Sequence, residues 1–167
     1  AMVALARWLG DQGIRAGFVT NDQGSDLVDT RLLRFCGAAT EEIAGGCFCC
    51  RFNELVDATQ RLRAVLRPDV FVAEAVGSCT DLAATVRSPM RRLLGDRCTV
   101  APLSVLVDPT RARRALGLER ADEFSANIQY IYRKQLEEAD LIVVAKSDLL
   151  DSAARDALSA ALRQEFP

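Results

Sequence analysis

Three cysteines lie within four positions of the chain, directly after a pair of glycines: Cys47, Cys49 and Cys50 follow Gly45-Gly46. Thiolates are soft ligands that select zinc, copper(I) and similar ions, and three of them this close converge on one ion only where the backbone turns sharply. Glycine permits such a turn. A disulfide is disfavoured because adjacent cysteines cannot bridge without strain. The alternatives are a metal site and a set of small buried thiols, and we favour the metal site.

The chain contains no histidine. A fourth ligand therefore has to be a carboxylate such as Glu42, another cysteine, water or a group from a second protein. An incomplete shell suits an ion that is carried and released better than a structural ion, and it permits, without requiring, a homodimer that shares the ion. The other cysteines, Cys36, Cys79 and Cys98, receive no functional role, and Cys79 is predicted to be buried.

Acidic residues stand at the ends of three apolar segments that have the length and composition of buried strands. The segments 16–20, 70–74 and 140–145 end at Asn21-Asp22, at Glu74 and at Lys146-Ser147-Asp148, respectively. Ligands of open α/β sheets bind at the carboxyl ends of the strands, which share one edge. We therefore predict that Asp22, Glu74 and Asp148 gather at one edge around one ligand.

The types of these residues fit a nucleotide site. Glu74 is placed like the acid that touches Mg²⁺ through water or orients the attacking water in phosphate-binding NTPases, and Asp22 can give the ion a second oxygen contact. The Asp148 carboxylate can accept both N1–H and the N2 amino group of guanine, while the stem of Lys146 lies over the purine. Adenine lacks that pair of donors, so the loop favours GTP.

Helical and extended patterns alternate along the chain. Apolar spacing predicts helices over 1–9, 52–66, 78–94 with a break near Pro89, 120–139 and 152–166, a further strand over 99–107, and a loop or short helix over 26–36. Such alternation is typical of a mostly parallel sheet with helices on both faces, which is a three-layer α/β fold.

Composition limits the class of protein. The 167 residues suffice for one domain that buries roughly 70 per cent of its unfolded surface. Hydrophobic residues make up 50 per cent and the net charge is -2, which argues against disorder and against nucleic-acid binding. The apolar start is interrupted by Arg7 and is too short to span a membrane or to act as a signal peptide. We expect a cytoplasmic protein whose cysteines are thiols or metal ligands.

The chain resembles the nucleotide-binding domain of the CobW-like metallochaperone GTPases, P-loop NTPases related to the urease and hydrogenase nickel-insertion GTPases. Four segments carry the resemblance: Asn21-Asp22-Gln23-Gly24 in the first switch region, Glu42 with Gly46-Cys47-Phe48-Cys49-Cys50 as the metal-binding CxCC segment, the E-x-x-G turn Glu74-Ala75-Val76-Gly77, and the base-recognition loop Ala145-Lys146-Ser147-Asp148.

The resemblance implies GTP hydrolysis with Mg²⁺, coupled to the handling of Zn²⁺ or Co²⁺ on behalf of a client metalloprotein. It assigns Asp22 and Glu74 to catalysis. It assigns nucleotide binding to Asn21, Gly77, Lys146, Ser147 and Asp148.

The chain departs from the family pattern in three ways. No G-x-x-x-x-G-K-[ST] phosphate loop occurs in residues 1–167, although phosphoryl transfer in this class depends on it. We expect the first strand and that loop, which in the family precede a helix like 1–9, to have been removed, cleaved or left unrecorded, and this polypeptide as given to be a poor GTPase. Ala145 replaces the usual asparagine or threonine, which weakens the inference of guanine specificity. The family's carboxyl-terminal domain does not occur within residues 1–167, so the chain is either a fragment or a short member of the family.

Two other functions fit parts of the pattern. A non-catalytic zinc-binding interaction module on a degenerate NTPase fold is favoured by the missing phosphate loop. An ATP-using kinase on a similar sheet is disfavoured by the loop 146–148.

Overall fold

The computed structural model describes residues 1–22, 28–119 and 124–167. Gln23 and Gly24 of the predicted switch segment, and Asp26, lie outside these residues. The chain divides into two compact units, Ala1–Cys79 and Thr80–Pro167, and each unit is described by itself.

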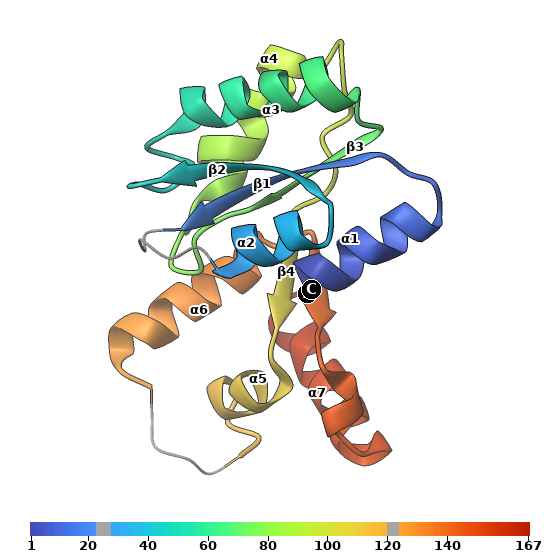
Figure 1. Cartoon of the computed structure of the whole chain (residues 1–167). Helices are drawn as coiled ribbons and strands as arrows, with labels where there is room; N and C mark the ends of the chain where they lie inside the picture. Colours follow the sequence, from blue (N-terminus) through green and yellow to red (C-terminus); the bar gives the residue numbers. More distant parts are fainter. Residues whose placement is uncertain (23–27, 120–123) are drawn as a thin grey trace. The chain divides into compact units, whose positions relative to one another are not determined.

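The first unit is built around a parallel sheet of three strands in the order β2-β1-β3 (Figure 1). Its elements in chain order are α1 (Met2–Asp11), β1 (Ala16–Asp22), α2 (Val28–Phe35), β2 (Ala39–Ala44), α3 (Phe52–Leu66) and β3 (Val70–Glu74).

Residues of β1 alternate between two buried faces of this sheet. Phe18 is 1% exposed and packs with Leu9 of α1 and Leu33 of α2. Gly17 points to the opposite face, where a Cβ atom would stand only 3.3 Å from the side chain of Leu62 of α3. Glycine is required there because α3 packs so closely on the strand. Helices α1 and α2 thus cover one face and α3 covers the other (Figure 1).

An ion pair at the amino ends of β1 and β3 fixes how these strands align. The backbone N–H of Arg15 donates to the carboxylate of Asp69 at 3.0 Å, and its guanidinium donates to the same group at 2.8 Å. The hydrogen bonds of Arg15 lower the pKa of Asp69 to about 2. This alignment sets the register that pairs Thr20 with Glu74 at the other end of the sheet.

The second unit contains two parallel strands and helices that cover one of their faces. Its elements are η1 (a π-helical turn, Ala83–Arg87), α4 (Ser88–Leu94), β4 (Ser104–Val107), α5 (Pro109–Ala115), α6 (Ala126–Glu138), β5 (Leu141–Val144), η2 (Ser147–Leu149) and α7 (Ser152–Glu165). Val107 of β4 packs with Ala112 of α5, Leu136 of α6 and Leu158 of α7. On the opposite face of the strands, Leu106 is 52% exposed.

The predicted α/β class, with parallel strands and helices between them, is confirmed. Among the described residues the strands form two sheets, of three and two strands, where one sheet was expected. Helix α3 and strand β3 have the predicted bounds, and α1, β1, β5 and α7 lie within two residues of theirs.

Several predicted elements require correction. Strand β2 was not predicted, because Thr40, Glu41 and Glu42 interrupt any apolar pattern. The predicted strand 99–107 is limited to 104–107. The helix expected over 78–94 does not break at Pro89: the π-helical turn η1 precedes α4, and Pro89 occupies the first turn of α4, where no N–H is needed.

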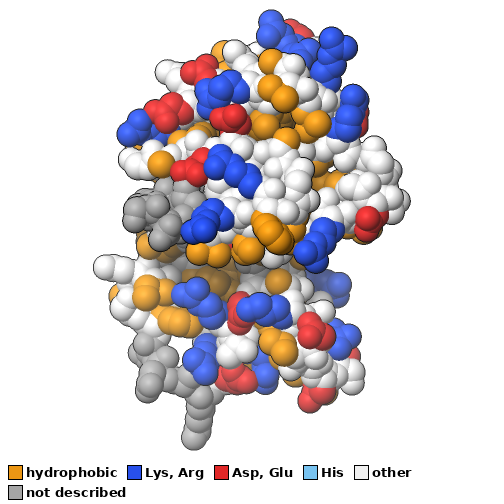
Figure 2. All heavy atoms as spheres, viewed as in Figure 1, with side chains coloured by type: hydrophobic (Ala, Val, Ile, Leu, Met, Phe, Trp, Pro, Cys, Tyr) orange, Lys and Arg blue, Asp and Glu red, His pale blue; other side chains and the backbone are white. Residues whose placement is uncertain are grey.

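Charged side chains of both signs are interspersed with apolar ones on the face drawn in Figure 2. Within the described parts of the chain, none of the helices combines the length and the apolar character needed to cross a bilayer.

Candidate functional site

The three clustered cysteines lie in the turn that joins β2 to α3. Gly45 has φ +75°, a left-handed conformation that favours glycine. The N–H groups of Cys50 and Arg51 both donate to the carbonyl of Cys47, at 3.1 and 2.9 Å, so the chain folds back on itself. Phe48 is 2% exposed and anchors the turn in the core. The turn is therefore held by its second residue while the cysteines on either side remain accessible.

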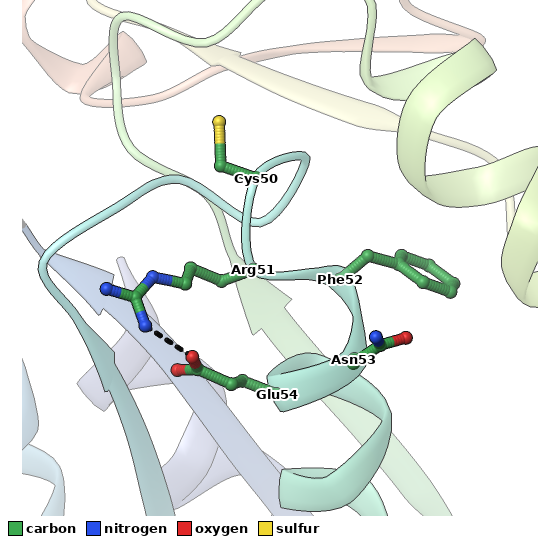
Figure 3. A pocket seen from close by; sticks show the side chains of 5 residues that line it. All are labelled: Cys50, Arg51, Phe52, Asn53 and Glu54. Atoms are coloured by element: carbon green, nitrogen blue, oxygen red, sulfur yellow. Dashed lines mark hydrogen bonds and ion pairs between the residues drawn. The ribbon is translucent and has the colours of Figure 1, made fainter.

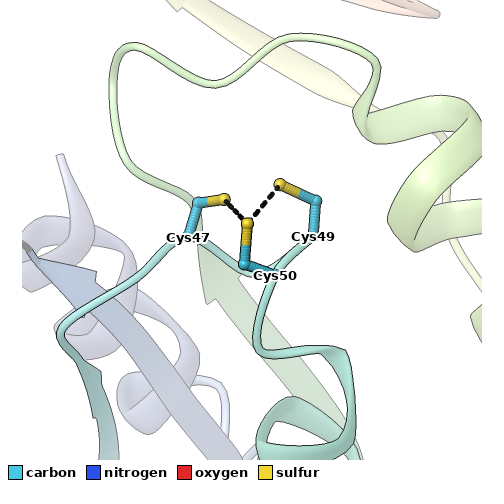
Figure 4. A group of neighbouring side chains, drawn as sticks. All are labelled: Cys47, Cys49 and Cys50. Atoms are coloured by element: carbon cyan, nitrogen blue, oxygen red, sulfur yellow. Dashed lines mark hydrogen bonds between the residues drawn. The ribbon is translucent and has the colours of Figure 1, made fainter.

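The sulfurs of this turn already converge. The Sγ atoms of Cys47 and Cys50 are 3.4 Å apart, those of Cys49 and Cys50 are 4.0 Å apart, and all three lie within 4.8 Å of one another (Figure 4). Sulfurs bound tetrahedrally to one Zn²⁺ at about 2.3 Å stand about 3.8 Å apart. The three thiols thus have nearly the spacing of three corners of a zinc site.

Hydrogen bonds between the thiols shift the pKa values of Cys47 and Cys49 in opposite directions. The hydrogen bond from Cys49, together with the N–H and thiol of Cys50, lowers the pKa of Cys47 to about 7. Donating to Cys47 raises the pKa of Cys49 to about 12. The Cys47 thiol therefore ionises more readily than the Cys49 thiol, and the thiolate is the form that binds metal ions.

Asn21 ties the end of β1 to this turn. Its Nδ2 donates to the carbonyl of Ile43 at 2.9 Å and to the carbonyl of Gly46 at 2.6 Å, immediately before Cys47. The side chain is buried, and its Oδ1 has no partner among the described residues. Through these two hydrogen bonds the amide of Asn21 positions the cysteine turn, and nucleotide binding by Asn21 stays a prediction.

Two predicted carboxylates form a row across the sheet with a threonine between them. Thr20 of β1 is in register with Glu42 of β2 and with Glu74 of β3, so the three side chains share one face. The hydroxyl of Thr20 is 2.6 Å from that of Thr30 in α2, which places the row on the face covered by α2. Partial desolvation and the negative charge of Asp29 raise the pKa of Glu74.

The sheet therefore separates the two sets of residues. Asn21 is the next residue along β1, so it and the cysteine turn belong to the face opposite the Thr20 row. Glu42 does not join the cysteine group, whose members are the three thiols. Asp22 pairs with Ala44 at the end of β1, and Gly77 is exposed in the turn that follows Glu74.

The base-recognition loop lies in the second unit. Lys146 has φ +51°, an uncommon conformation for a residue with a side chain, and its Nζ is 3.1 Å from the carboxylate of Asp108. Ser147 and Asp148 open the turn η2, and Asp148 is exposed. Because Asp148 belongs to a different unit from Asp22 and Glu74, their meeting at one edge stays a prediction.

A shallow pocket of about 430 Å³ adjoins the cysteine turn and is lined by residues 50–54 (Figure 3). Arg51 and Glu54, two of the lining residues, form an ion pair, and the sulfur of Cys50 points away from that pair (Figure 3). The pair fixes the guanidinium of Arg51 away from the sulfurs.

Sequence reasoning did not identify the positioning role of Asn21 or the place of Thr20 between two carboxylates. Both features depend on how β1 pairs with β2. The sequence of β2 has no pattern strong enough to predict that pairing.

This chain is similar to known proteins over most of its length. A curated relative from Sinorhizobium sp., described as the zinc chaperone CobW, is 30% identical over 173 aligned residues, which cover 88% of this chain and 48% of that protein. The chain thus spans about half the length of this relative. The family model for the nucleotide-binding domain of CobW/HypB/UreG proteins matches residues 4–166. A turn with three converging cysteine sulfurs, which follows a parallel strand, accords with that match. The chain belongs to the CobW/HypB/UreG family through its nucleotide-binding domain.

Proposed function

We propose that this chain is the nucleotide-binding part of a GTP-dependent metal chaperone that carries zinc as cargo for a client metalloprotein. The observation that carries the proposal is the convergence of the Cys47, Cys49 and Cys50 sulfurs within 4.8 Å of one another. Family membership and the zinc-chaperone description of the relative support zinc over cobalt. Three thiolates bind zinc firmly and still leave one position at which a client's ligand can begin to remove it.

In this proposal, the carboxyl ends of the strands hold GTP with Mg²⁺. Glu74 orients the attacking water, and its raised pKa makes it a stronger base than an ordinary glutamate. Asp22 adds an oxygen contact to the Mg²⁺ ion. The turn at Gly77 binds the nucleotide. Lys146, Ser147 and Asp148 recognise guanine. Residues 1–167 contain no G-x-x-x-x-G-K-[ST] segment, so we expect this polypeptide to hydrolyse GTP slowly.

Zinc titration under reducing conditions tests the metal assignment. The unaltered chain is expected to bind one equivalent, and a variant with Cys47, Cys49 and Cys50 changed to serine is expected to bind none. Its matched control changes Cys36 and Cys98 to serine, which alters two thiols outside the cluster. Equal zinc binding by the triple variant and the control means that the cluster does not hold the ion.

The second candidate, a zinc-binding interaction module without turnover, is favoured by the lack of a phosphate loop in these residues. Measuring zinc affinity with and without nucleotide separates the two functions. A nucleotide that favours the zinc-bound conformation raises the affinity for zinc. Zinc must then raise the affinity for the nucleotide by the same factor. A chaperone is expected to show a factor of roughly 5 to 150 with Mg²⁺ and GTP. A factor of one at saturating GTP supports the module.

A further inference from the structure

A fourth thiol adjoins the cysteine turn from the segment that follows β3. Cys79 is 8% exposed, and its N–H donates to the carbonyl of Val76 at 2.9 Å, which closes a tight turn. It belongs to the same compact unit as the cysteine turn. Figure 4 shows the segment after β3 passing over the side of the turn on which the three sulfurs lie.

The thiol of Cys79 is directed at the cluster. A side-chain hydrogen bond connects it to Cys47, and both Cys47 and Cys50 act on it electrostatically. Its sulfur does not lie within 4.8 Å of all three others. The Cys79 thiol therefore contacts one corner of the sulfur triangle and stands outside the triangle itself.

The other sources of a fourth ligand in this unit are restricted. The chain has no histidine. Glu42 shares a sheet face with Thr20 and Glu74, whereas Asn21 binds the cysteine turn on the opposite face. Cys36, the other cysteine of this unit, follows α2, where its sulfur accepts from the guanidinium of Arg7. The buried thiol of Cys79 is the soft donor beside the three others, and Cys₄ is a common closed zinc shell.

We propose that Cys79 completes a four-thiolate zinc site with Cys47, Cys49 and Cys50, through a shift of the turn at Val76–Cys79 toward the cluster. The inference rests on the proposed function, because it takes the metal site of the cysteine turn as given. Binding releases the proton of the Cys79 thiol as its sulfur joins the ion.

Through Cys79, the zinc ion is connected by a short stretch of backbone to Glu74, the residue proposed to orient the attacking water. Cys79 follows Glu74 by five positions in one continuous segment, and Gly77 lies between them. An ion that holds Cys79 restricts the turn that begins at Glu74. Conversely, a change at Glu74 that withdraws the turn removes one thiolate and opens the site for release.

X-ray absorption at the zinc edge measures the number of sulfur ligands in the unaltered chain without any substitution. Four sulfurs are expected in the intact protein, and three sulfurs with one oxygen or nitrogen are expected in Cys79→Ser and Cys79→Ala. Zinc affinity of both variants is expected to fall at least roughly tenfold, since even loss of an outer-shell partner costs 10- to 100-fold. Cys98→Ser is the matched control and is expected to retain four sulfurs.

Three outcomes overturn the inference. Three sulfurs in the intact chain remove Cys79 from the site while leaving the proposed function in place. Four sulfurs retained in Cys79→Ser assign the fourth ligand to another thiol, either of this chain or of a second copy. Absence of zinc binding by the intact chain refutes the metal site itself, and with it both proposals.

Discussion

Single residues of the cysteine turn differ in acidity because each thiol donates to or accepts from its neighbours. The hydrogen bonds that Cys49 and Cys50 make with Cys47 lower the pKa of Cys47 to about 7, whereas the hydrogen bond to Cys47 raises the pKa of Cys49 to about 12. Since thiolates are the nucleophiles, we predict that iodoacetamide labels Cys47 well before Cys49 in metal-free protein near pH 7. The rate at Cys47 is expected to fall roughly tenfold per unit of pH well below its pKa.

Peptide mass spectrometry after timed quenching measures this order. Cys49→Ala removes the largest contribution to the acidity of Cys47, so this variant is expected to label more slowly at Cys47. Zinc is expected to protect both positions. Faster labelling of Cys49 than of Cys47 contradicts the hydrogen-bond direction.

Asn21 contributes to the cysteine turn through two donated hydrogen bonds. Asn21→Ala leaves the carbonyls of Ile43 and Gly46 without their side-chain donor, and leaving buried groups unpaired costs about 1–3 kcal/mol of unfolding free energy each. We predict lower stability in urea and weaker zinc binding, because Gly46 immediately precedes Cys47. The matched control is Asn53→Ala, an exposed residue in the first turn of α3, which is expected to change neither. A loss of stability with unchanged zinc affinity contradicts the positioning role.

At the scale of elements, the pair between Arg15 and Asp69 makes the alignment of β1 and β3 sensitive to acid. The folded pKa of Asp69 is about 2, below the value of about 3.9 for an unfolded chain. A depressed folded pKa stabilises the fold above the unfolded pKa, and this contribution disappears as pH falls through the folded value. We predict that Asp69→Asn has a lower Tm than the unaltered chain near neutral pH and that the difference vanishes between about pH 4 and pH 2. Thermal melts across that range measure it, and a constant difference contradicts the assignment.

Elements with a strong apolar period were predictable, and those defined by pairing were not. Helix α3 has buried residues at Leu55, Ala58 and Leu62, a spacing that the sequence displays directly. Strand β2 has one fully buried residue, Ile43, and its Glu41 is stabilised by the ion pair with Arg61 of α3. Such a strand has no apolar alternation to detect. The convergence of Cys47, Cys49 and Cys50 was predictable because these residues are neighbours in sequence, whereas the approach of Cys79 depends on the turn after β3.

At the scale of the whole molecule, every proposed zinc ligand lies in the first unit, Ala1–Cys79. A ligand that binds only the folded site stabilises it by mass action, by about 2.7 kcal/mol at a concentration about 100 times Kd. We predict that zinc slows amide hydrogen exchange in β1, β2 and the segments 45–51 and 75–79. Helices α5, α6 and α7 are expected to exchange at unchanged rates, because local openings there leave the zinc ligands in place.

Exchange measured with zinc and with a chelator tests this division, and the triple serine variant of the cysteine turn is the control that should show no difference. Slowing confined to the first unit means that the units open independently, so that zinc reports on the sheet that carries Glu74. Equal slowing of α7 contradicts the prediction and means that the two units unfold as one. In that case zinc binding stabilises the unit that contains Lys146 and Asp148 because both units unfold together. No movement of the turn at Cys79 is then required.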